Sequence, residues 1–357
     1  MKKIGIITLC SNNNFGNKLQ NYALKKLLES NKDFIVETIW VENSFKSNKL
    51  KSLLKMYKNK YSDYFVEYDR NKYFIKFTKK YLSVSNKLIF NDDLNKIKHI
   101  YDYYVVGSDQ VWNYNFIGNF DIYFMLSVER EKCISYAASI GVDSIPDKLK
   151  QCYIDGFNHI DKLSVRENRG KEIIEELTRR KDIEVLVDPT MLLKDEDWDK
   201  ISKKPKQLKA DKYILNYFLG DLSQERKKEI DKIAKENNCE VINILDKNSP
   251  FYQTGPSEFL WLEKHAFLIC TDSFHSSVFA ILYNRPFVVF NREDKTVSMN
   301  SRIETLLCKF KLKNREFTGY ITEENLNHDY TEAYEILEKE RIRSKGFLKK
   351  ALNMEEE

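Results

Sequence analysis

The chain has 357 residues and a mass of 42.5 kDa, which exceeds what one ordinary hydrophobic core fills, so we expect two domains. Hydrophobic residues make up 42% of the sequence and aromatic residues 13%, which excludes a disordered or low-complexity chain. The formal net charge is only +5, which argues against a nucleic-acid partner but permits a phosphorylated or acidic ligand.

The six cysteines lie far apart and form no C-x-x-C pair, so we expect reduced thiols and no metal site. No apolar run approaches the ~18 residues of a membrane span. The start, "MKKIGIITLCSNNNFG", has too short an apolar core for a signal peptide and is expected to be a first strand. These features predict a cytoplasmic protein and leave open a peripheral association with the inner face of the membrane.

The amino-terminal part of the chain predicts a βαβ unit and therefore a parallel sheet. Residues 3–10 form an apolar β-type run, the loop "SNNNFGN" follows, and residues 18–30 have apolar side chains at helical spacing. Residues 33–41 supply the next strand. Residues 43–90 are rich in Lys and Tyr and predict a helical insertion in the first domain. Acidic residues interrupt that basic stretch, which favours a solvated helical face over nucleic-acid or membrane contact.

The rest of the chain continues the alternation of strands and helices. Strands are expected within residues 101–106, 132–141, 162–168, 183–190, 213–220, 240–245, 266–271 and 286–290. Helices are expected within residues 148–159, 169–180, 224–237, 256–265 and 276–284. A polar, Lys-rich seam at residues 190–212 separates the two halves, so the predicted domains are 1–190 and 191–330, with a carboxyl-terminal helix at 331–357 that packs back across the seam.

This order predicts an α/β protein of two Rossmann-like domains that face each other across a cleft, the arrangement called GT-B. Ligands of such sheets bind at the carboxyl ends of the strands. Three polar clusters follow predicted strands: "SNNNFGN", "GSDQVWN" and "TDSFHSS". Each cluster alone is equally well explained by helix caps. Three of them at one cleft favour a functional site.

The cluster "TDSFHSS" lies between a predicted buried strand and a predicted buried helix. Ser276 and Ser277 are then expected in the first turn of the helix, where free N–H groups and the helix dipole favour an anion. His275 beside them is a candidate general acid or a candidate hydrogen-bond donor to a phosphate. Asp272 is a candidate partner that sets the tautomer of its ring. The alternative is that His275 and Asp272 cap or pack the helix.

Two further residues are candidates at strand ends. Arg166 can bind a carboxylate or phosphate through its planar fork, or form a surface ion pair with Glu167 or another neighbour. Asp109 can act as a general base, bind sugar hydroxyls, or cap a helix. The chain contains no G-x-G-x-x-G, Walker, G-x-S-x-G or H-E-x-x-H pattern, so a tightly bound dinucleotide or P-loop nucleotide has no support.

An ordered set of motifs resembles the polysaccharide pyruvyl transferase family. The motifs are "KIGIITLCSNNNFGNKLQNYAL", "YVVGSDQVWN", "SYAASIG", "LSVRENRG", "VLVDPTMLL" and "TDSFHSSVFAILYNRPFVVFNR", within residues 3–292. The resemblance implies a GT-B-like transferase that moves the enolpyruvyl group of phosphoenolpyruvate onto sugar hydroxyls of a cell-surface polysaccharide precursor. The products are a pyruvate ketal and phosphate. The acceptor would be a lipid-linked or polymeric saccharide, and no cofactor is required.

The resemblance also implies roles for particular residues. Arg166 and His275 would hold phosphoenolpyruvate together with Ser276 and Ser277, and His275 would be the acid. The first domain would bind the acceptor, through the residues Asn14, Asn17, Asp109 and Gln110, with Asp109 also catalytic. Two positions depart from the family pattern: Ser276 stands where Gly is frequent, and Cys10 and an asparagine run occupy the first loop. The first-loop change bears on which sugar is used.

Two other functions remain compatible with the sequence. A protein of the same fold can be a glycosyltransferase that uses a nucleotide-sugar donor, or a non-catalytic carbohydrate-binding or scaffold protein. The combination of Asp109, Arg166 and His275 disfavours the non-catalytic protein, because a binding module does not need all three. The oligomeric state is not predicted.

Overall fold

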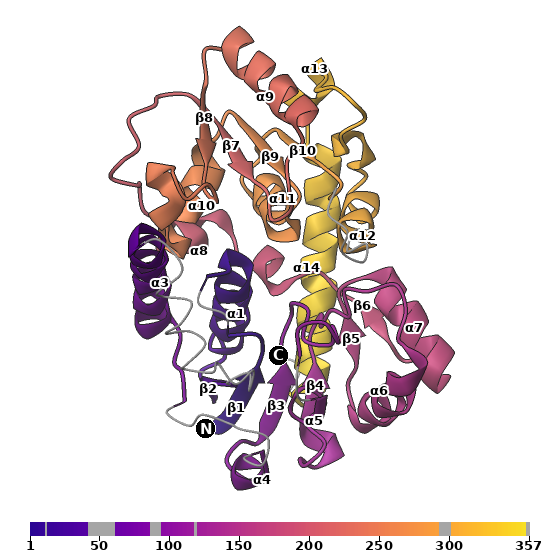
Figure 1. Cartoon of the computed structure of the whole chain (residues 1–357). Coiled ribbons are helices and arrows are strands. Elements are labelled where there is room, and N and C mark those ends of the chain that lie inside the picture. Colours follow the sequence, from indigo (N-terminus) through magenta and orange to yellow (C-terminus); the bar gives the residue numbers. More distant parts are fainter. Residues whose placement is uncertain (11–12, 42–60, 86–93, 118–119, 293–300, 355–357) are drawn as a thin grey trace. The chain divides into compact units, whose positions relative to one another are not determined.

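The computed structural model describes residues 1–10, 13–41, 61–85, 94–117, 120–292 and 301–354 (Figure 1). Two compact units divide the chain. Unit 1 comprises Met1–Leu53, Lys76–Leu193 and Glu338–Glu357, and unit 2 comprises Leu54–Ile75 and Lys194–Leu337. The predicted insertion at 43–90 lies within the described part only over residues 61–85, and Ser11 and Asn12 of the first loop lie outside it.

Unit 1 is built on parallel strands. Its sheet has the order β2-β1-β3-β4, formed by β1 (Lys2–Ile7), β2 (Phe34–Ile39), β3 (Tyr103–Val106) and β4 (Cys133–Ser135). Two short strands, β5 (Ser164–Val165) and β6 (Glu184–Val185), also pair in parallel. Isolated parallel bridges, Ile134 to Lys162 and Ala138 to Val165, connect β4 with the segment of β5. All strands of this unit therefore end at one edge.

Helices cover the strands of unit 1 as in a Rossmann-like fold (Figure 1). They are α1 (Phe15–Leu28), α4 (Leu94–Ile97), α5 (Phe120–Tyr123), α6 (Asp147–His159), α7 (Asn168–Thr178) and the 3-10 helices η1 (Arg130–Lys132) and η2 (Pro189–Leu192). The core contains a cluster of aromatic rings, in which Trp112 meets Phe157 edge-on at 5.1 Å and stacks on Phe124 at 5.7 Å. This packing fixes the loop that follows β3.

Unit 2 repeats the design with a second parallel sheet of order β10-β9-β7-β8. Its strands are β7 (Tyr213–Tyr217), β8 (Glu240–Asn243), β9 (Leu268–Thr271) and β10 (Phe287–Val289). Its helices are α8 (Asp195–Asp199), α9 (Gln224–Glu236), α10 (Pro256–His265), α11 (Phe274–Leu282), α12 (Ser301–Lys309), α13 (Glu323–Leu326), η3 (Pro250–Gln253) and η4 (Lys313–Arg315).

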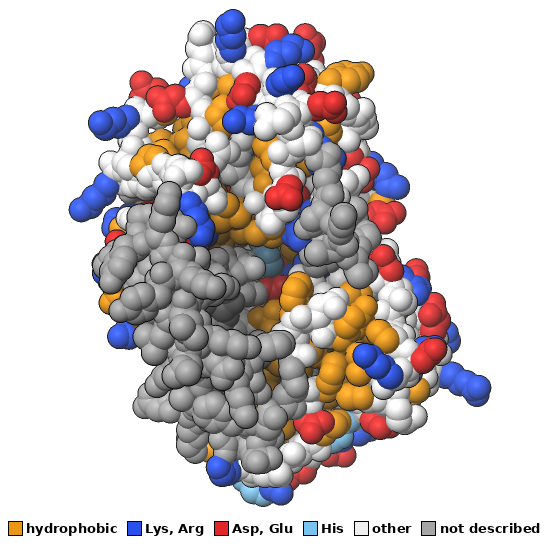
Figure 2. Space-filling model, in the orientation of Figure 1, with side chains coloured by type: hydrophobic (Ala, Val, Ile, Leu, Met, Phe, Trp, Pro, Cys, Tyr) orange, Lys and Arg blue, Asp and Glu red, His pale blue; other side chains and the backbone are white. Residues whose placement is uncertain are grey.

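Two helices of unit 2 differ in how they meet water. All residues of α11 are buried, as expected for a helix that is apolar on every side. Helix α9 carries exposed Lys and acidic side chains in alternation, and Figure 2 shows these blue and red groups at the top of the view.

Helix α14 (Thr331–Ala351) begins in unit 2 and ends in unit 1. In unit 2, Tyr334 Oη donates to the carbonyl of Ile281 at 3.0 Å. In unit 1, Arg341 donates to the carbonyls of Met191 (2.8 Å) and Leu193 (2.7 Å). The chain thus returns to its first unit through its last helix.

Helix α3 (Tyr61–Tyr81) also contributes to both units. The sequence assigned it to an insertion of the first domain, whereas residues up to Ile75 belong to unit 2. The reason is the buried side chain of Arg70, which donates to the carbonyls of Tyr252 (2.5 Å) and Ile244 (3.3 Å). In the part of the chain that the structure describes, no helix is both long and apolar enough to cross a membrane.

Candidate functional site

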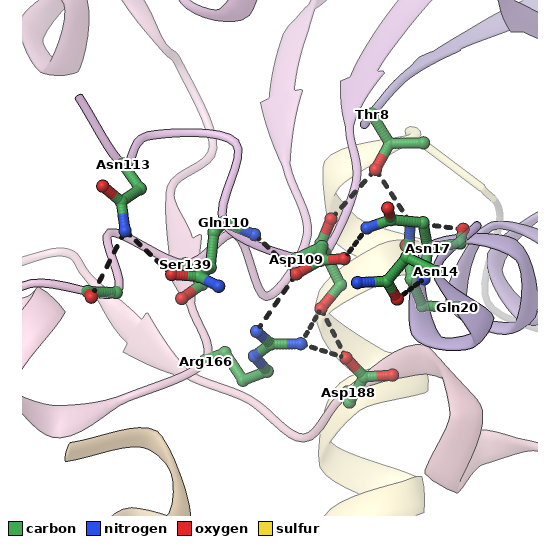
Figure 3. Close-up of polar contacts among 12 residues, drawn as sticks. Thr8, Asn14, Asn17, Gln20, Asp109, Gln110, Asn113, Ser139, Arg166 and Asp188 are labelled. Atoms are coloured by element: carbon green, nitrogen blue, oxygen red, sulfur yellow. Dashed lines mark hydrogen bonds and ion pairs between the residues drawn. The ribbon is translucent and has the colours of Figure 1, made fainter. Parts of the chain in front are cut away.

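The carboxyl edge of the unit 1 strands gathers a network of polar side chains (Figure 3). Arg166, which follows β5, lies at its centre and is 3% exposed. Its Nη1 donates to Asp188 Oδ2 at 2.7 Å and to Ser108 Oγ at 3.2 Å. Its Nη2 lies 3.8 Å from Asp109 Oδ1. The guanidinium therefore lies between two carboxylates, and its ion pairs are buried ones with Asp109 and Asp188, in place of the alternative surface pair with Glu167.

Asp188 was not singled out by the sequence, although it follows the apolar run of β6 just as Asp109 follows β3. Its Oδ2 also accepts a hydrogen bond from Ser108 Oγ at 2.6 Å. Its Oδ1 accepts from the backbone N–H and the hydroxyl of Thr190, at 3.0 and 2.7 Å, and so caps η2. Each oxygen of Asp188 thus accepts two hydrogen bonds, and together they hold Arg166, Ser108 and the start of η2 in place.

Asp109 has a backbone φ of 77°, in the left-handed region that residues other than Gly rarely adopt. Its side chain is well held, because Oδ2 accepts from Asn17 Nδ2 and Oδ1 accepts from the N–H of Gln110 at 2.8 Å. A carboxylate has about four acceptor positions, so about two remain. The roles of general base and hydroxyl binder therefore stay predictions for Asp109.

The structure brings together the four residues predicted to bind the acceptor. Asn14 caps α1 by accepting from the N–H of Asn17 at 3.1 Å, while the Asn17 amide bonds to Asp109. Gln110 Oε1 accepts from Asn113 Nδ2 at 2.8 Å. In Figure 3, Asn14 and Asn17 lie to one side of Asp109 and Gln110 lies to the other. Asn14 acts as a cap, whereas the Asn17 amide and the backbone N–H of Gln110 bond to Asp109.

Glu167 is a second residue that the sequence missed. Its Oε1 accepts three hydrogen bonds, from Ser139 Oγ (2.9 Å) and the N–H groups of Ile140 (2.8 Å) and Gly141 (3.1 Å). The loop after β4 is thereby tied to the start of α7. Gly141 in turn lies against the Gln110 side chain. Arg166 thus holds the loop after β3 through Ser108, and Glu167 holds the loop after β4. The Gln110 side chain lies between these two loops.

Gly141→Ala is expected to disturb this arrangement. Gly141 has a φ of 65°, and an added Cβ would overlap the Gln110 amide. We expect a loss of about 1–3 kcal/mol in the free energy of unfolding, measured in urea. Gly346→Ala in α14 is the control, because nothing lies within 4 Å of the added carbon. This control is expected to gain about 0.5–1 kcal/mol. Equal stability of the two variants would contradict the prediction.

Lys18 of α1 is a buried cation at the same edge. Its Nζ lies 3.4 Å from the carbonyl of Cys10 and 5.4 Å from the centre of the Trp40 ring. Burial lowers the pKa of Lys18 to about 8 and raises the pKa of the Cys10 thiol. Cys10 is therefore a neutral thiol at physiological pH, and its hydrogen bond goes to the carbonyl of Thr8 at 3.4 Å.

In unit 2, α11 begins at Phe274, two residues earlier than the sequence predicted, because Ser273 caps it. His275 therefore lies within the first turn of the helix and is 6% exposed. Its ring meets that of Phe274 edge-on at 5.3 Å. The position beside a helix amino terminus agrees with the requirements of an anion site, and the catalytic role of His275 remains a prediction.

The hydroxyls of Ser276 and Ser277 point into unit 2. Ser276 Oγ donates to Glu263 Oε1 at 2.6 Å, and Ser277 Oγ donates to the carbonyl of Ser273 at 3.1 Å. Both residues are fully buried. These buried hydroxyls thus bond to internal acceptors. The predicted binding of a donor relied on the backbone N–H groups of this turn and stays a prediction. A donor contact at this turn is left to the backbone and to His275.

Asp272 holds a loop and an arginine. Its oxygens accept from the N–H groups of Leu219 (2.7 Å) and Gly220 (2.8 Å), and Arg292 Nε lies 3.3 Å away. These contacts join the ends of β7, β9 and β10. The expected pairing of Asp272 with the His275 ring is replaced by this role.

Glu263 of α10 is fully buried, and burial raises its pKa well above the usual value of 4.5. The folded protein therefore binds this proton more tightly than the unfolded chain does. The stabilisation that results is complete below about pH 4.5 and is lost as the pH rises toward the folded pKa, by up to about 1.4 kcal/mol per pH unit.

Glu263→Gln is expected to remove this pH dependence, because the amide keeps the acceptor for Ser276 and carries no proton to lose. The free energy of unfolding of the variant relative to the unsubstituted protein should rise from about pH 5 to pH 8 in urea titrations. Ser276→Ala is the control, since it removes the hydrogen bond but keeps the carboxyl group and hence the decline. A constant difference for Glu263→Gln across this range would refute the prediction.

Comparison of the sequence with family models identifies residues 14–294 as polysaccharide pyruvyl transferase, which is more than half of the chain. The chain belongs to that family. Asp109, Arg166, Asp188 and His275 all lie within the matched region. Comparison with curated proteins found no match. Among the described residues, no three His, Cys, Asp or Glu side chains are grouped as a metal site requires.

Solved structures support the fold of this pyruvyl transferase family member. The S. aureus protein MnaA in complex with UDP has a TM-score of 0.52 and 13% identity, covering 100% of this chain and 98% of that one. A Listeria monocytogenes protein described as a UDP-N-acetylglucosamine 2-epimerase has a TM-score of 0.52 and 12% identity, covering 96% and 90%. Together with the two parallel sheets, this likeness gives a GT-B-like fold of two Rossmann-like units.

Proposed function

We propose that this protein transfers the enolpyruvyl group of phosphoenolpyruvate onto two hydroxyls of a saccharide, forming a pyruvate ketal and releasing phosphate. The observation that carries the proposal is the family match over residues 14–294, which includes Asp109, Arg166 and His275. The acceptor is proposed to be a lipid-linked or polymeric precursor of a cell-surface polysaccharide. The transferase family to which the chain belongs supports this class of acceptor.

The reaction assigns a different task to each unit. Protonation of C3 of the donor creates cationic character at C2, where the first sugar hydroxyl adds and loses its proton. The second hydroxyl then adds to C2 and loses its proton, while the C2–O bond to phosphate breaks and phosphate leaves with that oxygen. His275 is the proposed acid, in line with its place in the first turn of α11. The helix amino terminus favours the negative donor.

The unit 1 network is the proposed acceptor side. Asn17, Asp109 and Gln110 offer amide and carboxylate groups of the kind that bind sugar hydroxyls. The positive φ of Asp109 is consistent with a functional residue, because backbone strain concentrates at such sites. Arg166, predicted to hold the donor, is paired with Asp188 at 2.7 Å. We therefore assign Arg166 a positioning role through Asp109, separate from the donor.

The test is an assay of the purified protein with phosphoenolpyruvate and a panel of lipid-linked and nucleotide-linked sugars. Phosphate release that depends on both substrates, together with a ketal on the acceptor by mass spectrometry, is the expected result. Calorimetry with phosphoenolpyruvate and with UDP-sugars separates this function from a nucleotide-sugar glycosyltransferase. Binding of a UDP-sugar, with no binding of phosphoenolpyruvate, would overturn the proposal.

A further inference from the structure

Helix α3 presents an exposed face that none of the roles above uses. The exposed residues of this face, hereafter the α3 face, are Tyr68, Lys72, Tyr73, Ile75, Lys76, Lys79 and Lys80. Three of the nine large apolar side chains that are exposed in the described part of the chain lie here: Tyr68 is 51%, Tyr73 40% and Ile75 40% exposed. Apolar and cationic groups are therefore concentrated together on one helix.

The opposite side of the helix explains why this face points outward. Arg70, Phe74 and Phe77 are at most 3% exposed. The Arg70 guanidinium lies 4.8 Å from the centre of the Tyr252 ring, and Phe77 meets Tyr22 at 6.2 Å. These contacts set the rotation of the helix about its axis. The α3 face is consequently fixed toward solvent with its tyrosines, isoleucine and lysines in place.

The charge on the α3 face is almost entirely positive. Among the described carboxylates near its four lysines, Asp69 pairs with Lys72 at 2.9 Å, while Glu67 of the same helix pairs with Lys247 at 3.2 Å. Helix α9 provides a contrast with the same number of exposed lysines: Lys227, Lys228, Lys232 and Lys235. There, exposed Glu225, Asp231 and Glu236 alternate with them, and no large apolar side chain is exposed. Of these two helices, α3 is the one whose described residues combine exposed lysines with exposed large apolar side chains.

We propose that the α3 face binds the surface of an anionic phospholipid bilayer. The lysine ammonium groups pair with lipid phosphates, while Tyr68 and Tyr73 lie at the level of the headgroups with their apolar rings toward the acyl chains. Ile75 enters the outer part of the hydrocarbon. A nucleic acid would match the lysines equally well but would leave Ile75 in water. This inference concerns a second surface and does not depend on the identity of the donor or acceptor.

The experiment is co-sedimentation of the full chain with vesicles, in which phosphatidylcholine alone is compared with mixtures containing phosphatidylglycerol. Binding is expected only to the anionic vesicles and should weaken as salt is added. The variant K72Q/K76Q/K79Q/K80Q is expected to lose on the order of several hundredfold in apparent affinity, since each of the four lysines near an anionic surface contributes about fivefold. The apolar contacts should leave some vesicle binding at high salt, where the charge attraction is screened. The variant Y68S/I75S is expected to lose this remaining binding.

The matched control is K227Q/K228Q/K232Q/K235Q on α9, which removes the same charge from the same protein. It is expected to lose less than about threefold, because those lysines alternate with carboxylates. Equal losses in the two fourfold variants would show a general effect of net charge and overturn the proposal. Binding to an RNA oligonucleotide without binding to anionic vesicles would also overturn it. Circular dichroism checks that every variant is folded.

Discussion

His275→Ala is expected to lower the turnover of phosphoenolpyruvate-dependent phosphate release by about 100-fold or more, because the loss of an acid typically costs ~10²–10⁴-fold. The fold should survive, since α11 keeps its Ser273 cap and its buried apolar neighbours. The cost in the free energy of unfolding is expected to be about 1 kcal/mol. Steady-state kinetics and urea unfolding of the same preparation measure the two effects separately.

His275→Gln divides the two possible roles of the imidazole. Glutamine donates a hydrogen bond but does not transfer a proton near neutral pH, so a Gln variant as slow as the Ala variant indicates an acid. Near-normal turnover of the Gln variant would identify His275 as a phosphate ligand only. His265→Ala is the control, because that exposed ring stacks on Trp261 at 3.9 Å and is not among the predicted site residues. Normal turnover and donor affinity in His275→Ala would remove His275 from the site.

Arg166→Ala is expected to destabilise the protein by about 3–5 kcal/mol, because it leaves the carboxylates of Asp109 and Asp188 buried without their cation. The guanidinium side chain is 1% exposed, and its contact with Asp188 is 2.7 Å. Sequence reasoning placed the loss in donor affinity instead. Because the guanidinium is buried between two carboxylates, we expect the main loss in the free energy of unfolding, which urea unfolding measures.

Arg169→Ala is the matched control for this prediction. Arg169 lies three residues further along, its side chain is 30% exposed, and it pairs with Glu172 and Glu176 at 3.0 Å. Exposed ion pairs contribute at most about 1 kcal/mol, so the control should be nearly as stable as the unsubstituted protein. A second variant, Arg166→Gln with Asp188→Asn, removes the cation and one carboxylate together. The double variant should lose less free energy of unfolding than Arg166→Ala. If Arg166→Ala lost as little as Arg169→Ala, the stabilising role of the buried Arg166 ion pairs would be refuted.

The parallel strands, most of the helices and the places where polar residues follow strands could be predicted from the sequence. Each of these depends on local chemistry: apolar runs specify buried strands, and apolar side chains at helical spacing specify α1. Asp109 and Arg166 were found because a polar residue after a buried strand of a parallel sheet must lie at its carboxyl edge. The family motifs lie in the same loops.

Only the tertiary structure decided which of these polar groups meet. Arg166 pairs with Asp188, 22 residues away, and Ser108 bonds to Asp188 across 80 residues. Glu263 accepts a hydrogen bond from the hydroxyl of Ser276, a contact that the sequence did not predict. Arg70 draws α3 toward unit 2 through carbonyls more than 170 residues later. Periodicity encodes which side of an element is buried, whereas the partner of a buried polar group depends on which distant acceptor the packing brings within hydrogen-bonding distance.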